Sequence, residues 1–447
     1  MAKKTKAADL SIEEKLEQAL VAPGYEPYKI PDNWCWVSLD SLGRFGMGQT
    51  ILSKDLIDNG IPVYSATEED RIFGFIYSND NLIKLSTNDI VIPARGNSIG
   101  YVKLISKKEA TCTQTTMFYK PINKEISKYI YYYMKSRKDD LFAYHGNAIP
   151  QITINKVSKK AVALAPMIEQ HRIVERIESL FSKLDEAKEK AQEVIDSFET
   201  RKAAILHKAF SGELTAKWRE ENGVGIESWE STKIGNMLTE IKYGTSEKSD
   251  YSFDGIPVFR IPNIGDMTLI FDDVKKIQRQ ECSENEYLSE NDILIIRSNG
   301  SKELVGKCAL VPKINFKCTY ASFLIRLRMK DSISSLYTVW YLTSEQARKQ
   351  LFNKAKSSAG IHNINSKEIS DISIVVPSKP EQNIITATLE RLITKEKETV
   401  IFAESVIDQM DAMKKAILAR AFRGELGTND PEEESAVELL KQILSGE

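Results

Sequence analysis

The sequence predicts an α+β protein in which two pseudo-symmetric domains are joined and spaced by two long helices that pair as a coiled coil. Three observations support this fold class. A stretch of 46 residues occurs twice, an apolar heptad pattern runs through both copies, and short strand-like segments occupy the regions outside them. A duplicated amphipathic helix needs a partner for its apolar face, and the other copy is the simplest one.

The composition is that of an ordinary folded chain. It has 447 residues, of which 42% are apolar and 28% charged, with a net charge of −2. At about 150 residues per domain, this length predicts three domains, or two with connecting elements. No run of about 18 apolar residues occurs, which excludes a transmembrane helix. The lysines near the start precede no apolar segment, so we expect no secretory signal.

Cysteine and histidine usage points to a cytoplasmic protein without a structural metal. Five cysteines are scattered without a C-x-x-C pair, and no two of the four histidines are four residues apart. An odd number of dispersed cysteines predicts reduced thiols in a cytosol. The spacing also argues against a zinc site.

The helical repeat dominates the sequence. Glu169–Leu214 aligns without gaps on Glu381–Leu426, and 20 of the 46 positions are identical. Elsewhere the halves match only in islands, such as Gly60–Tyr64 with Gly255–Phe259, and the offset between them drifts from 195 to 210. Drift indicates insertions, which surface loops tolerate. The halves therefore share a scaffold and differ in their loops, as two related modules reading different ligands would.

Each copy carries an a/d seam with spacings of four and three residues. Nothing breaks the first helix between Glu169 and Ser211, and Gly212 fits its end. We therefore expect a helix of about 40 residues and roughly 60 Å, a strut that also fixes the distance between two modules. The middle of the second seam is polar at Glu396 and Thr399. The predicted seam residues are Ile173, Ile177, Leu180, Leu184, Ala191, Val194 and Phe198, then Ile385, Leu389, Leu392, Ala403, Val406, Met410 and Ile417.

The remaining elements follow from local patterns. Ser11 and Glu14 form a capping-box pattern at the start of a helix over Ser11–Val21. Strands are predicted at Ile90–Ile92, Ile293–Ile296 and Phe323–Arg328, and helices at Tyr129–Met134 and Tyr337–Leu342. The expected order is an N-terminal helical arm (1–30), a first domain (31–168), a central spacer helix (169–214), a second domain (215–380), a distal spacer helix (381–426) and an acidic C-terminal helix (427–447).

Charge is unevenly distributed. Residues 41–160 hold 17 Lys and Arg against 11 Asp and Glu, and residues 236–377 hold 19 against 17. The first repeated helix holds 8 against 10. Positive charge in the two domains suits contacts with phosphate.

No catalytic motif is complete. Gly300 to Cys308 differs from a phosphate-binding loop by an extra residue and by a cysteine in place of Ser or Thr, and Phe45–Gly48 lacks the context of a methyltransferase cofactor loop. We interpret both as turns. The sequence predicts a binding and scaffolding protein with no catalytic residue, no metal and no cofactor of its own.

Particular motifs resemble one family. Each long helix begins with P-x-x-E-Q, at Pro166–Gln170 and, one residue longer, at Pro377–Gln382. Each ends with A-F-x-G-E-L, at Ala209–Leu214 and Ala421–Leu426. Pro31–Trp34 resembles a P-x-x-W domain opening, and Trp229 lies near the matching place. Together these resemble the specificity subunit of type I restriction-modification systems, over roughly residues 20–426.

The resemblance implies a DNA-binding subunit without catalysis. Two target-recognition domains would each read half of a split site in double-stranded DNA, and the helices would pair antiparallel as a ruler and dock two modification subunits. It implies that these partners bind S-adenosylmethionine and methylate adenine N6. A restriction subunit, where present, would use ATP and Mg. The expected place is the prokaryotic cytoplasm, on the nucleoid when DNA is bound.

Base reading favours Arg or Lys on guanine and Asn or Gln on adenine, from loops at strand ends. Arg95 and Arg297 are the strongest candidates, because both follow the matched strand after a shared Asn-Asp. The alternative for any one candidate is a solvated loop residue. The candidates are Gln49, Thr50, Lys54, Arg95, Asn97, Ser98, Lys103, Asn147 and Gln151 in the first domain, and Lys242, Thr245, Ser246, Arg297, Asn299, Lys302, Lys307, His362 and Asn363 in the second.

Two other functions stay open. A single-chain enzyme with its own methyltransferase or nuclease would show turnover alone, although its motifs are missing. A coiled-coil adaptor without DNA specificity would show no salt-sensitive binding to DNA.

Overall fold

A computed structural model describes residues 10–67, 72–143, 150–358 and 360–446. The chain forms two compact units, each of which combines one α+β module with part of the long helices. Unit 1 comprises residues Met1–Ala191 and Ser405–Glu447, and unit 2 comprises Gln192–Glu404. We call the α+β parts module 1 (residues 35–164) and module 2 (residues 230–376).

Module 1 is built on a four-stranded antiparallel sheet in the order β2-β8-β5-β6. Its strands are β2 (Gly43–Met47), β8 (Thr116–Pro121), β5 (Ile90–Pro93) and β6 (Lys103–Leu104). A second sheet has the order β4-β3-β7, with β4 (Gly74–Ile76), β3 (Ile61–Tyr64) and β7 (Thr111–Cys112), and β1 (Cys35–Ser38) pairs with β9 (Ala161–Leu164). The helices are α2 (Leu39–Leu42), α3 (Ser127–Ser136), α4 (Lys138–Leu141) and α5 (Ile154–Ser158), with 3-10 turns η1 (Ser53–Asp55) and η2 (Lys124–Ile126).

Module 2 repeats this plan with additions. The main sheet runs β11 (Leu238–Tyr243), β20 (Leu324–Met329), β16 (Ile293–Ile296), β18 (Cys308–Leu310) and β14 (Met267–Thr268). A second sheet runs β12 (Ser249–Asp250), β15 (Lys275–Ile277), β13 (Pro257–Phe259) and β19 (Thr319–Tyr320), and a third runs β17 (Ser298–Asn299), β22 (Ile361–Asn363) and β21 (Lys356–Ser358). β10 (Glu230–Lys233) pairs with β23 (Ser373–Val376).

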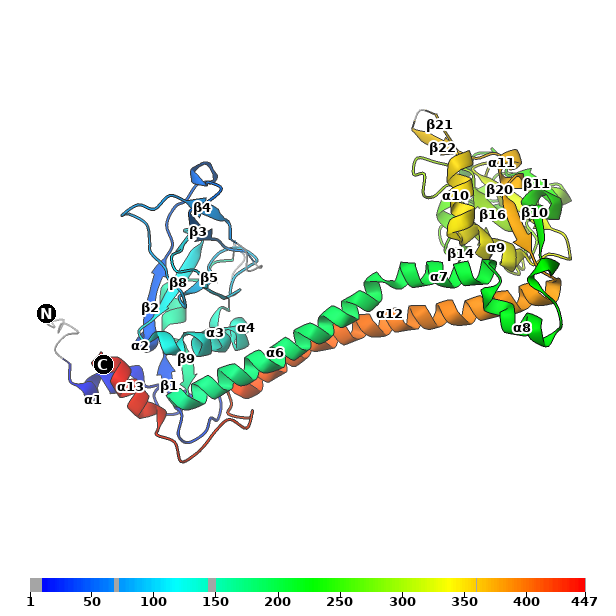
Figure 1. Cartoon of the computed structure of the whole chain (residues 1–447). Helices are drawn as coiled ribbons and strands as arrows, with labels where there is room; N and C mark the ends of the chain where they lie inside the picture. The colour runs from blue at the N-terminus through cyan, green and yellow to red at the C-terminus, as the bar shows by residue number, and fades with distance from the viewer. Residues whose placement is uncertain (1–9, 68–71, 144–149, 359, 447) are drawn as a thin grey trace. The chain divides into compact units, whose positions relative to one another are not determined.

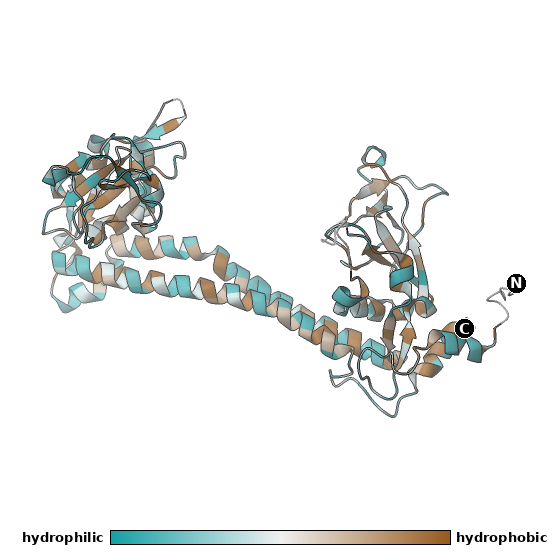
Figure 2. Ribbon diagram, turned by 180° about the vertical axis from the view of Figure 1, so that it is seen from behind, coloured by the Kyte–Doolittle hydropathy of each residue, from teal (hydrophilic) through white to brown (hydrophobic). Residues whose placement is uncertain are grey.

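The helices of module 2 are α9 (Ser335–Thr343), α10 (Glu345–Lys354) and α11 (Ser366–Ser370), with 3-10 turns η5 (Ile234–Met237), η6 (Ile261–Asn263) and η7 (Glu284–Glu286). The predicted strands and the two predicted aromatic helices are thus confirmed within one or two residues. Figure 2 shows apolar residues concentrated in the strands of both modules, where alternating side chains form the cores.

The shared Asn-Asp pair explains why the strands begin where they do. Asn88 and Asn291 both adopt the left-handed conformation, with φ of 69° and 68°. The next residue in each case, Asp89 or Asp292, accepts a 2.8 Å hydrogen bond from a backbone N–H three residues earlier. Asparagine tolerates this backbone better than other non-glycine residues, so the pair forms a turn that starts β5 and β16.

The long helices are α6 (Met167–Asp196), α7 (Phe198–Phe210) and α12 (Lys379–Ala421). In each unit the helices lie side by side and run antiparallel (Figure 1). In unit 1, Lys188 Nζ lies 3.3 Å from Asp411 Oδ1, and Lys414 forms an ion pair with Asp185. All predicted seam residues are buried or half-buried, with Ile173, Ile177, Ile385 and Leu389 inaccessible to solvent.

One prediction about these helices is wrong. We expected an unbroken helix through Ser211, but the structure ends α6 at Asp196 and starts α7 at Phe198. Ser197 lies at the break, where its hydroxyl donates to the carbonyl of Glu193 at 2.5 Å. Arg201 Nη1 donates to the carbonyl of Val194 at 3.0 Å. Side chains that bond the helix backbone in this way bend helices.

The polar middle of the second seam has a partner at this break. In unit 2, Arg201 Nε donates to Glu396 Oε2 at 2.6 Å, and both side chains are roughly a third exposed or less. At the equivalent repeat positions stand Met413 and Leu184. A polar pair in one copy therefore replaces apolar residues of the other.

Each module is fastened to the helices by the same contacts. Buried Glu169 accepts the indole N–H of Trp34 at 2.7 Å, and buried Glu381 accepts that of Trp229 at 3.0 Å. These are the Trp and Glu residues of the sequence motifs. The phenylalanine of the second A-F-x-G-E-L motif packs on module 1, and that of the first motif packs on module 2. Phe422, directly after α12, contacts the rings of Tyr129 and Tyr133 on α3, and Phe210 of α7 contacts those of Tyr337 and Tyr341 on α9.

The first and last described helices pack together in unit 1. The capping box of Ser11 and Glu14 is confirmed at the start of α1 (Ile12–Ala19), which packs against α13 (Ala436–Ser445). We predicted an acidic helix over 427–447, and the structure has a shorter helix in this range, which packs into the core of unit 1. Residues 427–435 precede the helix, Glu433 forms a bidentate ion pair with Arg172 at 2.6 and 2.8 Å, and Leu440 is fully buried.

Between the modules in sequence lie η3 (Glu213–Thr215), α8 (Ala216–Glu221) and η4 (Ile226–Ser228). Gly212 ends α7 in the left-handed conformation, with φ of +86°, as predicted. Across the described ranges, no helix is both long enough and apolar enough to cross a membrane. All five cysteines are free thiols.

Candidate nucleic-acid interface

In module 1, several predicted residues meet at one edge of the main sheet. Because β8 runs antiparallel to β2 and β5, the ends of β2 and β5 lie beside the start of β8. Thr50 Oγ1 donates to Gln114 Oε1 at 2.8 Å, and Arg95 forms a β-bridge with Gln151. We call the set Gln49, Thr50, Gln114, Arg95 and Gln151 polar edge 1.

Module 2 has a matching edge at the ends of β11 and β16 and the start of β20. Arg297 Nη1 donates to the carbonyl of Ser322 at 3.4 Å, and its guanidinium lies 4.8 Å from the ring centroid of Tyr243. β17 pairs with β22, so that Asn299 faces His362. We call the set Thr245, Ser246, Arg297, Asn299, His362, Asn363 and Tyr243 polar edge 2.

A glycine positions each edge. Gly48 precedes Gln49, and Gly244 precedes Thr245, and both chains then run parallel to the segment after β7 or β19. A Cβ atom on Gly48 would lie 2.2 Å from the carbonyl oxygen of Thr113, and one on Gly244 would lie 2.2 Å from that of Tyr320. Only glycine allows this close approach of two backbones.

The two favoured arginines do not occupy equivalent positions. Backbone N–H groups of Ala94 and Arg297 make the same 2.9 Å bond, to Thr115 and Phe323 respectively. Arg297 therefore matches Ala94, and Arg95 matches Ser298. A shift of one residue along a strand sends side chains to opposite faces. Arg95 is exposed, whereas Arg297 is half-buried against Tyr243.

Three other candidates are used inside their modules. The hydroxyl of buried Ser98 donates to the carbonyl of Ala66 at 2.9 Å. Lys103 is 3% exposed, and its ammonium donates to the carbonyl of Ser65 and to Thr67. Lys242 Nζ lies 2.7 Å from Glu240 Oε1. These contacts fit a supporting role for all three.

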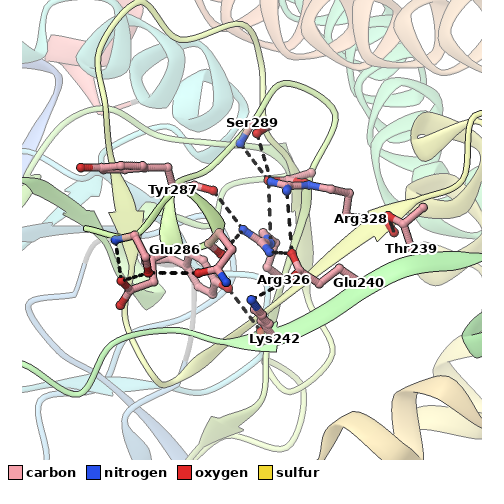
Figure 3. A network of polar contacts seen from close by, with 12 residues as sticks. Thr239, Glu240, Lys242, Glu286, Tyr287, Ser289, Arg326 and Arg328 are labelled. Atoms are coloured by element: carbon pink, nitrogen blue, oxygen red, sulfur yellow. Dashed lines mark hydrogen bonds and ion pairs between the residues drawn. The ribbon is translucent and has the colours of Figure 1, made fainter. Parts of the chain in front are cut away.

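Lys242 belongs to an ionic network on β11 and β20 (Figure 3). Arg326 is fully buried, donates to the carbonyl of Tyr287 at 2.9 Å and pairs with Glu240. Arg328 forms a bidentate ion pair with Asp292, with both distances 2.8 Å. Burial acts to raise the pKa of Glu240, but the hydrogen bond from Lys242 and the nearby arginine charges outweigh it and hold that pKa below its usual value.

The remaining candidates lie around the edges. Lys54 on η1 and Asn97 after β5 are exposed. Lys302 and Lys307 lie in the connection from β17 to β18, where the Lys302 ammonium is 5.5 Å from the ring centroid of Phe352. Asn147 lies outside the described residues. No group of three His, Cys, Asp or Glu residues suited to a metal occurs in the described part of the chain.

Sequence reasoning missed two exposed aromatic residues, Tyr243 in polar edge 2 and Phe323 beside it. Tyr243 is 43% exposed and Phe323, at the start of β20, is 56% exposed. It also missed Gln114, which Thr50 contacts. A signal was present for Phe323, which begins the predicted strand Phe323–Arg328, but an aromatic residue in a strand more often belongs to a core.

A known family of domains matches the chain twice, and each match contains one module. Residues 31–196 and 226–401 match the type I restriction modification DNA specificity domain. The chain is 28% identical over 298 residues to the type I restriction enzyme EcoKI specificity subunit of Escherichia coli strain K12, a match spanning 63% of each chain. It is 24% identical over 430 residues to the StySPI specificity subunit of Salmonella potsdam, covering 89% of this chain and 90% of that one.

Solved structures share the fold. The HsdS subunit from Thermoanaerobacter tengcongensis superposes with a TM-score of 0.62 at 18% identity, covering 90% of this chain and 99% of that one. A chain from a structural study of type I R-M complex assembly gives 0.64 at 19% identity, covering 90% and 100%. Because the matched domain occurs twice and spans most of the sequence, the chain belongs to the type I restriction-modification DNA specificity family, the non-catalytic subunits that its motifs predicted.

Proposed function

We propose that this chain reads a split sequence in double-stranded DNA, each module recognising one half through its polar edge. The observation that carries the proposal is the matched pair of edges. Both are placed by the same strands and the same glycine, yet they present different side chains. A common scaffold with different polar tips suits two half-sites of different sequence.

Within the edges, we assign base contacts to the accessible groups with bidentate chemistry. These are Arg95 and Gln151 in module 1 and Arg297 in module 2, with Thr50, Ser246, His362 and Asn363 beside them. The side-chain oxygen of Asn299 accepts the backbone N–H of Ser301 at 2.8 Å, so we assign Asn299 to support of polar edge 2. The side-chain oxygen of Gln49 accepts a hydrogen bond from the backbone N–H of Ile83 at 2.6 Å, so we assign Gln49 to support of polar edge 1. We assign Lys54, Asn97, Lys302 and Lys307 to contacts with backbone phosphates.

The paired helices serve as the spacer and as the dock for two modification subunits. Half-sites read from one face of the duplex lie about one turn, roughly 34 Å, apart. Docking is supported by Ile401 and Phe402, adjacent apolar residues of α12 that are 64% and 70% exposed. S-adenosylmethionine, adenine N6 methylation and, with restriction subunits, ATP and Mg belong to those partners in the cytoplasm.

A bound-DNA selection tests the proposal. The chain, co-purified with the modification subunits encoded beside it, is offered random duplexes at near-physiological salt, and the retained DNA is sequenced. We expect a split motif with a fixed gap. Exchange of module 2 for that of a relative should change one half only. Retention without enrichment would favour the adaptor alternative and remove the edge assignments.

A further inference from the structure

A basic cavity of about 580 Å³ lies in unit 1, between α3, α4 and the C-terminal part of α12. Lysines from separate elements line it, together with two tyrosines. The ammonium of Lys138 is 3.3 Å from the ring centroid of Tyr101, and that of Lys135 is 5.1 Å from that of Tyr131. Lys415 enters from α12. The surface is therefore charged and aromatic at once.

The charge of this cavity is not neutralised by the protein. Among the described residues, none of Lys135, Lys138 and Lys415 forms an ion pair with a carboxylate, and Asp139 is the one acidic residue in the described lining. Ammonium groups gathered around one space repel each other and raise the local potential for anions. A bound anion would relieve this repulsion.

Unit 2 supplies an internal comparison. Its corresponding cavity, about 450 Å³ between α7 and α10, is lined by Ala203, Leu206 and Gln346 among others. One lysine, Lys349, also lines it, but this lysine forms an ion pair with Glu345. The repeat offset of 212 matches Lys415 with Ala203, and alignment of Tyr129 with Tyr337 matches Lys138 with Gln346. The scaffold therefore forms a cavity in both units, but only in unit 1 do the matched positions carry lysine.

The cavity is connected to polar edge 1 by one short loop. Arg95 starts this loop at the edge, and Gly100 ends it at the cavity wall. Gly100 has a φ of +76°, and a Cβ atom there would lie 2.8 Å from the ring of Phe142. The loop is thus held against α4. Its cavity end lies five residues after Arg95, to which we assign a base contact.

We propose that this cavity binds a phosphate group of the DNA backbone and anchors module 1 beside its half-site. The inference rests on the proposed DNA-reading function and adds a site to it. Ammonium groups donate to phosphate oxygens without reading sequence, and such contacts fix the register of a protein on the duplex. Module 2, whose cavity has no lysine at the matched positions, depends on other contacts.

The test copies the unit 2 residues into unit 1, as Lys135→Thr, Lys138→Gln and Lys415→Ala. Full-length chain is titrated, with co-purified subunits, on its selected target and on an unrelated duplex from 50 to 200 mM salt. Each lost phosphate contact makes the negative slope of log affinity against log salt less steep by about 0.9, and lowers the affinity about fivefold at 0.15 M salt. We expect this loss on both duplexes, with the selected motif unchanged.

A control removes three exposed lysines elsewhere, as Lys183→Gln, Lys190→Gln and Lys217→Gln. An equal loss in the control would overturn the proposal, since net charge alone would then explain it. So would an unchanged slope in the cavity variant while the wild type still reads a split motif. The second result leaves the proposed function intact, whereas failure of the wild type to bind any duplex overturns that function itself.

The source of the phosphate is separated by a second measurement. Thermal unfolding of the wild type and the cavity variant is followed with inorganic phosphate and with ATP, in the absence of DNA. Stabilisation by a free anion that the variant loses, with no change in the DNA slope, would overturn the DNA assignment in favour of a small phosphorylated ligand. Loss of slope in the variant with no response to free anions supports the backbone phosphate.

Discussion

The indole N–H of Trp34 donates to Oε2 of Glu169 at 2.7 Å in a buried site, and Thr428 and Asn429 donate to the same carboxylate at 3.3 and 2.9 Å. The first residue opens module 1, the second opens α6, and the last two follow α12. One buried carboxylate therefore gathers three parts of the chain. Removing any donor leaves a buried charge undersatisfied.

Trp34→Phe should lower the free energy of unfolding by about 1–3 kcal/mol, because it removes a donor from a buried carboxylate. Trp36→Phe is the matched control. Trp36 is equally buried, but its indole N–H has no hydrogen-bond partner in the described part of the chain. Urea unfolding followed by far-UV circular dichroism measures both. Equal losses in the two variants would show that ring packing, not the hydrogen bond, accounts for the effect.

The contribution of the Arg201–Glu396 pair to stability can be measured by substituting the residues that stand at the matched positions of the repeat. Arg201→Met and Glu396→Leu should each cost roughly 1 kcal/mol, because each leaves a partly exposed charge in the seam without its partner. The double variant should recover the loss, since Met413 and Leu184 already stand at the matched positions. A double-mutant cycle measures the coupling. Additive losses would show that the pair does not interact.

Arg297→Ala should weaken binding of the cognate duplex by about 1–3 kcal/mol and relax one base position in the selected motif. Arg44→Ala, at the far end of β2 from polar edge 1, should leave the motif unchanged. The measurement is the bound-DNA selection repeated with each variant. An unchanged motif with Arg297→Ala removes this residue from the reading contacts.

The Glu240 network gives a pH dependence with a defined sign. The pKa of Glu240 is lowered in the fold, so its ionised form stabilises unit 2 above the unfolded pKa, and this contribution is lost as the pH falls through the lowered value. The stability difference between wild type and Glu240→Gln should be full at pH 6 and shrink below about pH 4. Chemical denaturation across this range measures it. A difference independent of pH would assign the effect to shape alone.

Leu440→Ala should destabilise unit 1 by about 2–5 kcal/mol, because Leu440 is fully buried in the core that α13 shares with module 1. Gln442→Ala, on the exposed face of the same helix, is the control. Calorimetry of the full chain should show the transition of unit 1 lowered and that of unit 2 unmoved. A simultaneous shift of both would show that the units unfold together.

Features that depend on local or repeated sequence patterns could be predicted from the sequence. The heptad seam and the capping box at Ser11 follow from local rules, and the duplicated motifs identified the family. The break at Ser197 was not readable, because it depends on hydrogen bonds from Ser197 and Arg201 to the preceding turn, and neither residue is a helix breaker. The burial of α13 depends on α1, more than 400 residues away in the sequence.

The edges were predicted in outline and less well in detail. The ends of β5 and β16 were located, so Arg95 and Arg297 were expected beside them, and their contact with bases stays a prediction. Lys103 and Lys242 were chosen for their charge. In the structure, however, Lys103 donates hydrogen bonds to Ser65 and Thr67 and Lys242 pairs with Glu240. The one-residue shift between Arg95 and Arg297 was invisible for a similar reason, since register is set by pairing between strands.

Phe422, α13 and the residues after α12 complete unit 1, while unit 2 is contiguous from Gln192 to Glu404. This order matters while the chain is being made. At about 5–20 residues per second, the ribosome adds the segment that follows Ala191 over tens of seconds. During that interval α3 exposes the tyrosine surface that Phe422 will cover, although unit 2 can already fold. The domain synthesised first is the last to be finished, and the time before its completion is when a chaperone would be most needed.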